Sequence, residues 1–203
     1  MLDGLMRRAL DPSLNGAGRV LARRGIRANQ VTLVGFALGM LAAMLIALGV
    51  SCLIALIPLL ASRIADGLDG AVARASKITD FGGFLDIVCD FIFYGAIPLA
   101  FVVRDPTVNG LAGAFLLMSF YVNGASFLSF AILAAKRGMT TENRGIKSLY
   151  FTSGLLEGTE TIGLFVILCI FPNAFVPLAW GFGTLCFITA LLRATLAWRA
   201  FSD

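Results

Sequence analysis

Two adjacent apolar segments of this chain carry four aspartates, and this combination limits what the chain can fold into. The stretch DGLDGAVARASKITDFGGFLDIVCD, residues 66–90, contains them as Asp66, Asp69, Asp86 and Asp90. Residues three or four apart share a face of an α-helix, so each segment, read as a helix, carries one acidic seam. If the chain reverses near Ile78, Asp66 lies level with Asp90, and Asp69 with Asp86. A helical hairpin whose seams face each other would therefore bring the four carboxylates together.

The composition indicates a protein that crosses a membrane several times. Of the 203 residues, 59% are hydrophobic and 14% are charged, and the mean hydropathy is +0.90, which is far from the composition of soluble domains. We expect an all-α membrane protein with six transmembrane helices in one domain, residues 29–203. The predicted spans, each near the roughly 20 residues that cross the hydrocarbon core, are 31–50, 52–74, 82–103, 110–135, 149–171 and 175–198.

The first 28 residues form a separate amphipathic segment. Leu2, Leu5, Met6 and Ala9 share one helical face, and six arginines are distributed through residues 1–28. One interpretation is an interfacial helix whose arginines lie toward lipid phosphates. The alternative is a positively charged anchor that sets topology and binds no ligand.

The distribution of basic residues predicts the orientation in the membrane. The arginines of residues 1–28, Arg74 with Lys77, four cations between the fourth and fifth predicted spans, and Arg199 all fall on one side, whereas Arg104 is alone on the other. By the positive-inside rule, both termini and the acidic hairpin are cytoplasmic. The compact chain suggests a multi-pass protein of a bacterial inner membrane.

The four acids need compensating charge. An ionised carboxylate within hydrocarbon costs roughly 3 kcal/mol on insertion scales, so these side chains must be paired, protonated or metal-bound. Arg63 and Arg74 cannot neutralise all four, and the chain contains no histidine. Clustered oxygen ligands suit Mg²⁺ or Mn²⁺, and four carboxylates are enough for two ions that clamp a phosphoryl group. Without histidine, any proton transfer falls to a carboxylate.

Small residues continue the acidic seams. Gly70 and Ala73 follow Asp66 on its column, and Gly82 lies one turn before Asp86. They leave space beside the acids for a bulky anionic ligand. The alternative is that they allow close packing of membrane helices.

Together these residues resemble the signature of the CDP-alcohol phosphotransferases, a family of integral membrane enzymes. The family pattern has two aspartates, a glycine, Ala-Arg, a spacer, and then a glycine and two aspartates. In this chain the pattern reads Asp66, Asp69, Gly70, Ala73, Arg74, Gly82, Asp86 and Asp90. Seven residues separate Arg74 from Gly82, one fewer than is usual in the family, and this difference bears on nucleotide contacts in the loop.

The resemblance implies a function. A CDP-linked donor, most often CDP-diacylglycerol, would transfer its lipid-phosphoryl group to an alcohol and release CMP. By position, the four aspartates would hold two Mg²⁺ or Mn²⁺ ions, and Asp90 would also accept the proton of the acceptor hydroxyl. The residues implied to bind the CDP group are Asp66, Asp69, Gly70, Ala73, Arg74 and Gly82. The resemblance also implies a homodimer, and we expect no nucleic-acid partner.

The acceptor would reach the site from the same cytoplasmic side. Candidate acceptor-binding cations are Lys136, Arg137 and Arg193, because a phosphorylated alcohol favours a guanidinium. Arg193 could instead pair with Glu157 inside the membrane, and topology alone accounts for the loop cations. Glycerol 3-phosphate is the commonest bacterial acceptor in the family, with inositol phosphate and serine as alternatives.

Two other functions compete with the enzyme. In an ion or proton transporter, the four aspartates would form a relay with Glu157 and Glu160. That function predicts acids spread through the membrane's depth, or broken helices in both halves, whereas the four aspartates gather in one hairpin. The other is a lipid-binding relative without catalysis.

Overall fold

The computed structural model of the chain describes residues 3–139, 156 and 158–202, and most of these residues are helical. The helices are α1 (Asp3–Arg23), α2 (Ala28–Ala47), α3 (Cys52–Ala75), α4 (Asp80–Arg104), α5 (Pro106–Lys136), α7 (Gly158–Ile170) and α8 (Phe175–Phe201), with a short 3₁₀ turn, η2 (Pro172–Ala174), before α8. The all-α prediction is confirmed for this part of the chain. Glu157 and most of the first half of the predicted fifth span lie outside the described residues.

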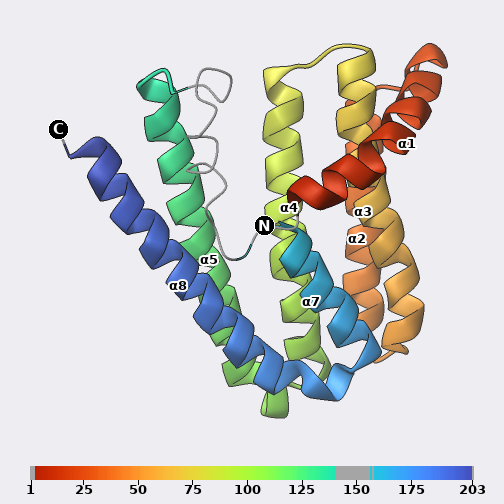
Figure 1. Cartoon of the computed structure of the whole chain (residues 1–203). Helices are drawn as coiled ribbons and strands as arrows, with labels where there is room; N and C mark the ends of the chain where they lie inside the picture. Colours follow the sequence, from red (N-terminus) through yellow and green to blue (C-terminus); the bar gives the residue numbers. More distant parts are fainter. Residues whose placement is uncertain (1–2, 140–155, 157, 203) are drawn as a thin grey trace.

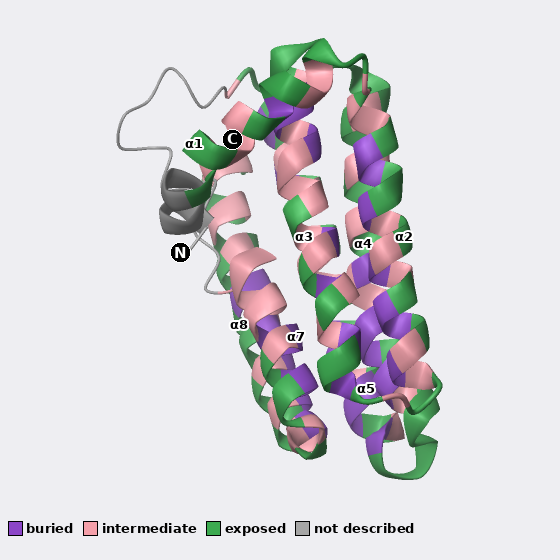
Figure 2. Cartoon of the chain, turned by 90° about the vertical axis from the view of Figure 1, so that its right-hand side faces the viewer, coloured by how far each residue is buried: buried purple, intermediate pink, exposed green. Residues whose placement is uncertain are grey.

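The length and apolar character of several helices fit a bilayer. Four helices could cross a membrane on these criteria, namely α2, α4, α5 and α8 together with η2. Helix α3 has 24 residues but carries Arg63, Asp66 and Asp69 among its apolar side chains, and the described part of α7 has 13 residues. Large apolar side chains cover the outside, and Leu48, Ile57 and Leu111 are each at least 70% exposed. Figure 2 shows exposed residues along the outer faces of the helices. Such a surface belongs in lipid, so this is a membrane protein.

The helices form two groups that meet at one end of the molecule. Figure 1 shows α2, α3 and α4 side by side with α7 beside them, while α5 and α8 form a second pair. Within the first group, small residues allow close approach. A Cβ atom added to Gly39 of α2 would lie 2.7 Å from Phe93 of α4 and 3.0 Å from Ser62 Oγ of α3. The backbones therefore pack as membrane helices do at small residues.

Helix α1 lies across α3 rather than along it (Figure 1). A Cβ atom on Gly18 would be 2.7 Å from Ala71 of α3, and one on Gly67 would be 3.0 Å from the side chain of Leu14. Arg74 of α3 donates a hydrogen bond to Asn15 of α1 at 2.9 Å. Helix α1 is thus packed on the half of α3 that carries the acidic motif.

Polar side chains cap the first turns of α4 and α5. The chain reverses between α3 and α4 at residues 76–79, as predicted, and Thr79 Oγ1 accepts a hydrogen bond from the Gly82 amide at 3.1 Å. At the other end, Asp105 accepts one from the Val108 amide at 3.0 Å, directly before Pro106. Such caps fix where a helix begins. The Thr79 cap therefore fixes where α4 begins after the reversal.

Candidate active site

Asp66 and Asp90 lie on either side of a buried guanidinium. Nη1 of Arg63 donates to Asp90 Oδ1 at 2.8 Å and lies 3.6 Å from Asp66 Oδ1. Because one nitrogen reaches a carboxylate on each helix, the acidic seams of α3 and α4 face each other. The predicted equal depth of this pair is confirmed.

Asp69 is anchored by the neighbouring helix. Thr32 Oγ1 of α2 donates to Asp69 Oδ2 at 2.5 Å. The side chain of Asp69 is buried, at 6% exposed. Sequence reasoning missed Thr32, although a hydroxyl in the first turns of the span before the acidic helix was a usable signal.

The four carboxylates form one electrostatic group. Asp66 interacts through charge with Asp69, Asp86 and Asp90 as well as with Arg63. Asp86 makes no hydrogen bond or contact ion pair with the residues the structure describes. One guanidinium cannot offset four carboxylates, so the group carries a surplus of negative charge when its members are ionised.

The chemistry of this group fits a hard divalent cation. Its donors are carboxylate oxygens, supported by a hydroxyl, which is the set that Mg²⁺ and Mn²⁺ prefer. As the side chains stand, no three acidic, histidine or cysteine side chains in the described ranges converge tightly enough to hold an ion. The guanidinium of Arg63 lies between Asp66 and Asp90 and contacts one oxygen of each. The residues therefore fit by the type of their donor atoms, and the carboxylates would have to turn to share an ion.

The other motif residues cluster at the same end of the hairpin. A Cβ atom on Gly70 would lie 3.3 Å from Arg74 Nη1, and one on Gly82 would lie 2.9 Å from Thr79 Oγ1 and 3.2 Å from Asn29 Oδ1. Ala73 is half-buried one turn beyond Asp69. A side chain at position 82 would therefore press on the cap of α4 and on Asn29 of α2. The guanidinium of Arg74 already donates to Asn15 of α1.

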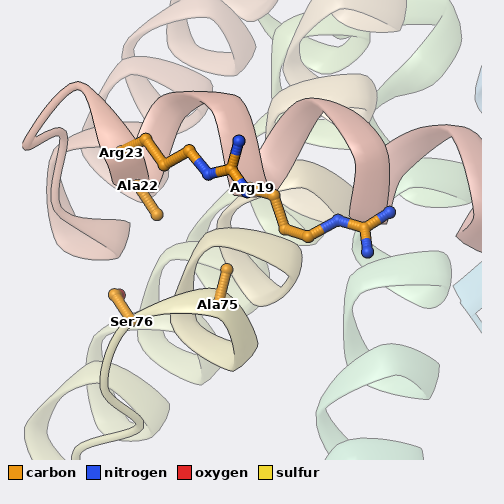
Figure 3. Close-up of a pocket in the computed structure, with 5 residues that line it drawn as sticks. All are labelled: Arg19, Ala22, Arg23, Ala75 and Ser76. Carbon is orange, nitrogen blue, oxygen red and sulfur yellow. The ribbon is translucent and has the colours of Figure 1, made fainter.

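An open pocket of about 500 Å³ lies where α1 crosses the end of α3. Its lining residues, shown in Figure 3, are Arg19, Ala22, Arg23, Ala75 and Ser76. Neither guanidinium has a hydrogen-bond or ion-pair partner within the described chain. The sequence predicted arginines of this segment near lipid phosphates, and their basic surface suits such a group.

The predicted acceptor-binding cations lie on the other pair of helices. Arg193 of α8 donates to the backbone carbonyl of Asn123 at 3.0 Å, to its side chain at 2.9 Å and to Ser126 Oγ at 2.6 Å, all on α5. Arg137 of α5 donates to the carbonyls of Ala200 and Phe201 at 2.8 and 3.2 Å, and Lys136 is exposed. These contacts join α5 to α8 and involve none of the four aspartates.

The fold and the acidic hairpin define a membrane protein with a group of carboxylates whose oxygen donors suit a divalent cation. The family model of the CDP-alcohol phosphatidyltransferases matches residues 26–198, so the chain belongs to this family and is an enzyme of that class. The resemblance drawn from the motif is confirmed. Family membership favours the enzyme over a transporter.

Individual relatives agree with this assignment. The chain is 48% identical over 193 residues to the inner membrane protein YnjF of Escherichia coli, an alignment covering 95% of this chain and 93% of that protein. It is 39% identical over 111 residues to the archaetidylinositol phosphate synthase of Pyrococcus horikoshii, covering 51% of this chain and 58% of that one. The phosphatidylinositol phosphate synthase PgsA1 of Mycobacterium tuberculosis, solved with CDP-DAG bound, shares the fold with a TM-score of 0.61 and 21% identity, over 91% of this chain and 93% of that one.

Proposed function

We propose that this protein transfers a phosphatidyl or related substituted phosphoryl group from CDP-diacylglycerol or a similar CDP-alcohol to an acceptor alcohol and releases CMP. The observation that carries the proposal is the meeting of the two acidic seams, where Arg63 contacts Asp66 and Asp90 at once. Family membership supports the reaction class, and the donor bound to the structural relative supports the choice of substrate.

In this proposal Asp66, Asp69, Asp86 and Asp90 hold two Mg²⁺ or Mn²⁺ ions. When bound, such ions neutralise the diphosphate and favour ionisation of a nearby hydroxyl. Thr32 orients Asp69 through its 2.5 Å hydrogen bond. The CDP group would lie against Gly70, Ala73 and Gly82, beside Asp66 and Asp69, with Arg74 at its edge.

The residues of the chain then have distinct tasks in the transfer. Asp90 accepts the proton of the acceptor hydroxyl, whose oxygen forms a bond to the phosphorus that carries the lipid. The bond between that phosphorus and the CMP oxygen breaks, and CMP leaves with the electron pair. Such a reaction depends on alignment and charge stabilisation more than on covalent catalysis by the protein.

For the acceptor we retain glycerol 3-phosphate as the first candidate, with Lys136, Arg137 and Arg193 as its binding residues. The C-terminal ends of α5 and α8 lie at the same end of the molecule as the α3–α4 connection, which supports this placement (Figure 1). The hydrogen bonds of Arg193 to Asn123 and Ser126 support a structural role instead, and the two roles can be separated experimentally.

We also propose six spans in a catalytic domain of residues 29–203, with residues 1–28 as an interfacial helix. The crossing of α1 over α3 and the basic pocket of Arg19 and Arg23 support that position. The charge distribution supports cytoplasmic termini and active site, and the name of the E. coli relative supports an inner membrane. A homodimer would use part of the exposed apolar surface, and cross-linking in nanodiscs would test it.

The decisive test is release of CMP from radiolabelled CDP-diacylglycerol by the purified protein in nanodiscs, with Mg²⁺ or Mn²⁺ and separate acceptors. We expect metal-dependent release with glycerol 3-phosphate, inositol phosphate or serine. Asp90→Asn should lower the rate by roughly 10²–10⁴-fold, the range for loss of a general base. Asp80→Asn removes an exposed carboxylate from the first turn of the same helix and should leave the rate nearly unchanged.

If no acceptor led to CMP release in the presence of either Mg²⁺ or Mn²⁺, the proposal would be refuted. Full activity in Asp90→Asn would remove Asp90 from the role of base while leaving the reaction itself in place.

A further inference from the structure

Arg63 is buried in the middle of the acidic group, and the motif assigns it no role. Its side chain is 10% exposed, and Nη1 contacts both Asp90 and Asp66. Nη2 donates to Ser62 Oγ at 3.1 Å. A cation at this depth is retained only where it is paired, and here its ionic partners are two of the four proposed metal ligands.

Two further contacts of Arg63 do not involve those ligands. The guanidinium carbon lies 3.9 Å from the centre of the Phe93 ring, a distance at which a cation is attracted to an aromatic face. Phe93 is 1% exposed, and Ser62 is fully buried. The ring and the hydroxyl would therefore continue to hold the guanidinium if it released Asp90.

The hydrogen-bonding of Arg63 is incomplete. Its Nε is buried and has no hydrogen-bond partner in the described chain. An unsatisfied buried donor is costly, particularly on a charged group. The acidic partners thus hold Arg63 in a position in which one of its hydrogen-bond donors has no acceptor.

Arg63 and a divalent ion would compete for the same oxygens. A carboxylate oxygen that accepts from a guanidinium is less available to a metal, and two positive charges a few ångströms apart repel each other. We propose that Arg63 is a resident counter-cation that stabilises the metal-free site, releases Asp90 when divalent ions bind, and thereby weakens the affinity for those ions. This inference rests on the proposed metal site.

The test measures metal binding directly, without turnover. Mn²⁺ binding to the full chain in nanodiscs is followed by the loss of the free-ion electron paramagnetic resonance signal. Arg63→Gln should bind Mn²⁺ roughly ten- to a hundredfold more tightly, because a nearby positive charge is removed. In the presence of a chelator its thermal unfolding temperature should be lower than that of the unsubstituted chain, and Mn²⁺ should restore it.

Matched variants separate this role from general effects of charge or packing. Arg104→Gln removes a guanidinium from the far end of α4, where it bonds to the Val50 carbonyl, and should leave Mn²⁺ affinity unchanged. Ser62→Ala removes the hydroxyl that would hold the guanidinium after it releases Asp90, and should weaken Mn²⁺ binding by roughly two- to fivefold. Ser62→Ala also decides the question if Arg63→Gln does not fold.

The outcomes distinguish this inference from the function on which it rests. If the unsubstituted chain binds Mn²⁺, Arg63→Gln binds it no more tightly and Ser62→Ala binds it no less tightly, the role of Arg63 is overturned and the metal site stands. If the unsubstituted chain and both variants bind no Mn²⁺, the proposed metal site and the inference fail together.

Discussion

The acidic hairpin of α3 and α4 and the paired helices α5 and α8 differ in how their charged side chains are compensated. In the hairpin, four carboxylates share one guanidinium, and Asp86 has no contact partner among the described residues. In the α5–α8 pair, Arg193 and Arg137 donate to carbonyl, amide and hydroxyl oxygens of the facing helix. A charged side chain whose hydrogen bonds are made within the helix pair supports the fold. A group of carboxylates with too few cations beside it indicates a ligand-binding site.

Asp86→Asn gives the largest effect expected from this comparison. Transfer should fall by roughly 10²–10³-fold, because charge stabilisation at the reacting group is lost. The metal-free protein should be as stable or slightly more stable, since one repelling charge is removed from the group. CMP release and thermal unfolding in chelator measure the two effects. Lower stability together with unchanged activity would show that the acids serve the fold.

Arg193→Met tests the opposite expectation for α5 and α8. Loss of a guanidinium that bonds to Asn123 and Ser126 should destabilise the protein by about 2–4 kcal/mol, lowering the unfolding temperature by roughly 5–10 °C. The KM of the donor should hardly change. A large rise in acceptor KM at unchanged stability would instead identify Arg193 as an acceptor-binding residue.

Gly39→Ala tests the packing that brings Arg63 to the acids. The added Cβ would meet Phe93 at 2.7 Å, so Phe93 must move, at a cost of about 1–3 kcal/mol. Gly95→Ala on α4 is the matched control, because nothing lies within 4 Å of its added Cβ. Thermal unfolding should separate the two variants. Equal stability would mean that the contact between α2 and α4 adapts freely.

Thr32→Val should have the smallest effect. It preserves shape but removes the hydroxyl that donates to Asp69, which costs about 1 kcal/mol. The rate of CMP release should fall by roughly tenfold or less as Asp69 loses its fixed orientation. A Thr32→Ser variant retains the hydroxyl and should keep most of the activity. Equal rates in Thr32→Val and the unsubstituted chain would exclude this orienting role.

Sequence reasoning predicted those features that depend on helical periodicity. Given a reversal near Ile78, the spacing of the four aspartates predicted that Asp66 lies level with Asp90 and Asp69 with Asp86, because helix geometry alone relates those positions. Helix ends were predicted to within a few residues for α3, α4 and α8. The motif then supplied the family, which periodicity by itself could not have done.

Contacts between segments distant in sequence were harder to predict. Thr32 and Phe93 reach Asp69 and Arg63 only through the packing of α2, α3 and α4 around Gly39, and no local pattern encodes that packing. Arg63 was considered only as an incomplete source of neutralising charge, because its position between two carboxylates depends on rotamers. For Arg193, the sequence suggested an acceptor or a pair with Glu157, which lies outside the described residues, and it gave no sign of the hydrogen bonds to Asn123 and Ser126 on α5.

The packing of α1 against α3 has a consequence for how the enzyme sits in its membrane. With Gly18 against Ala71 and Leu14 over Gly67, there is little room for either helix to slide. If α1 lies at the level of the lipid headgroups, as proposed, its contact with α3 fixes the depth of the aspartates in the bilayer relative to the headgroup plane. In a thicker bilayer the donor lipid would have longer acyl chains, but its reacting phosphorus would stay level with the aspartates.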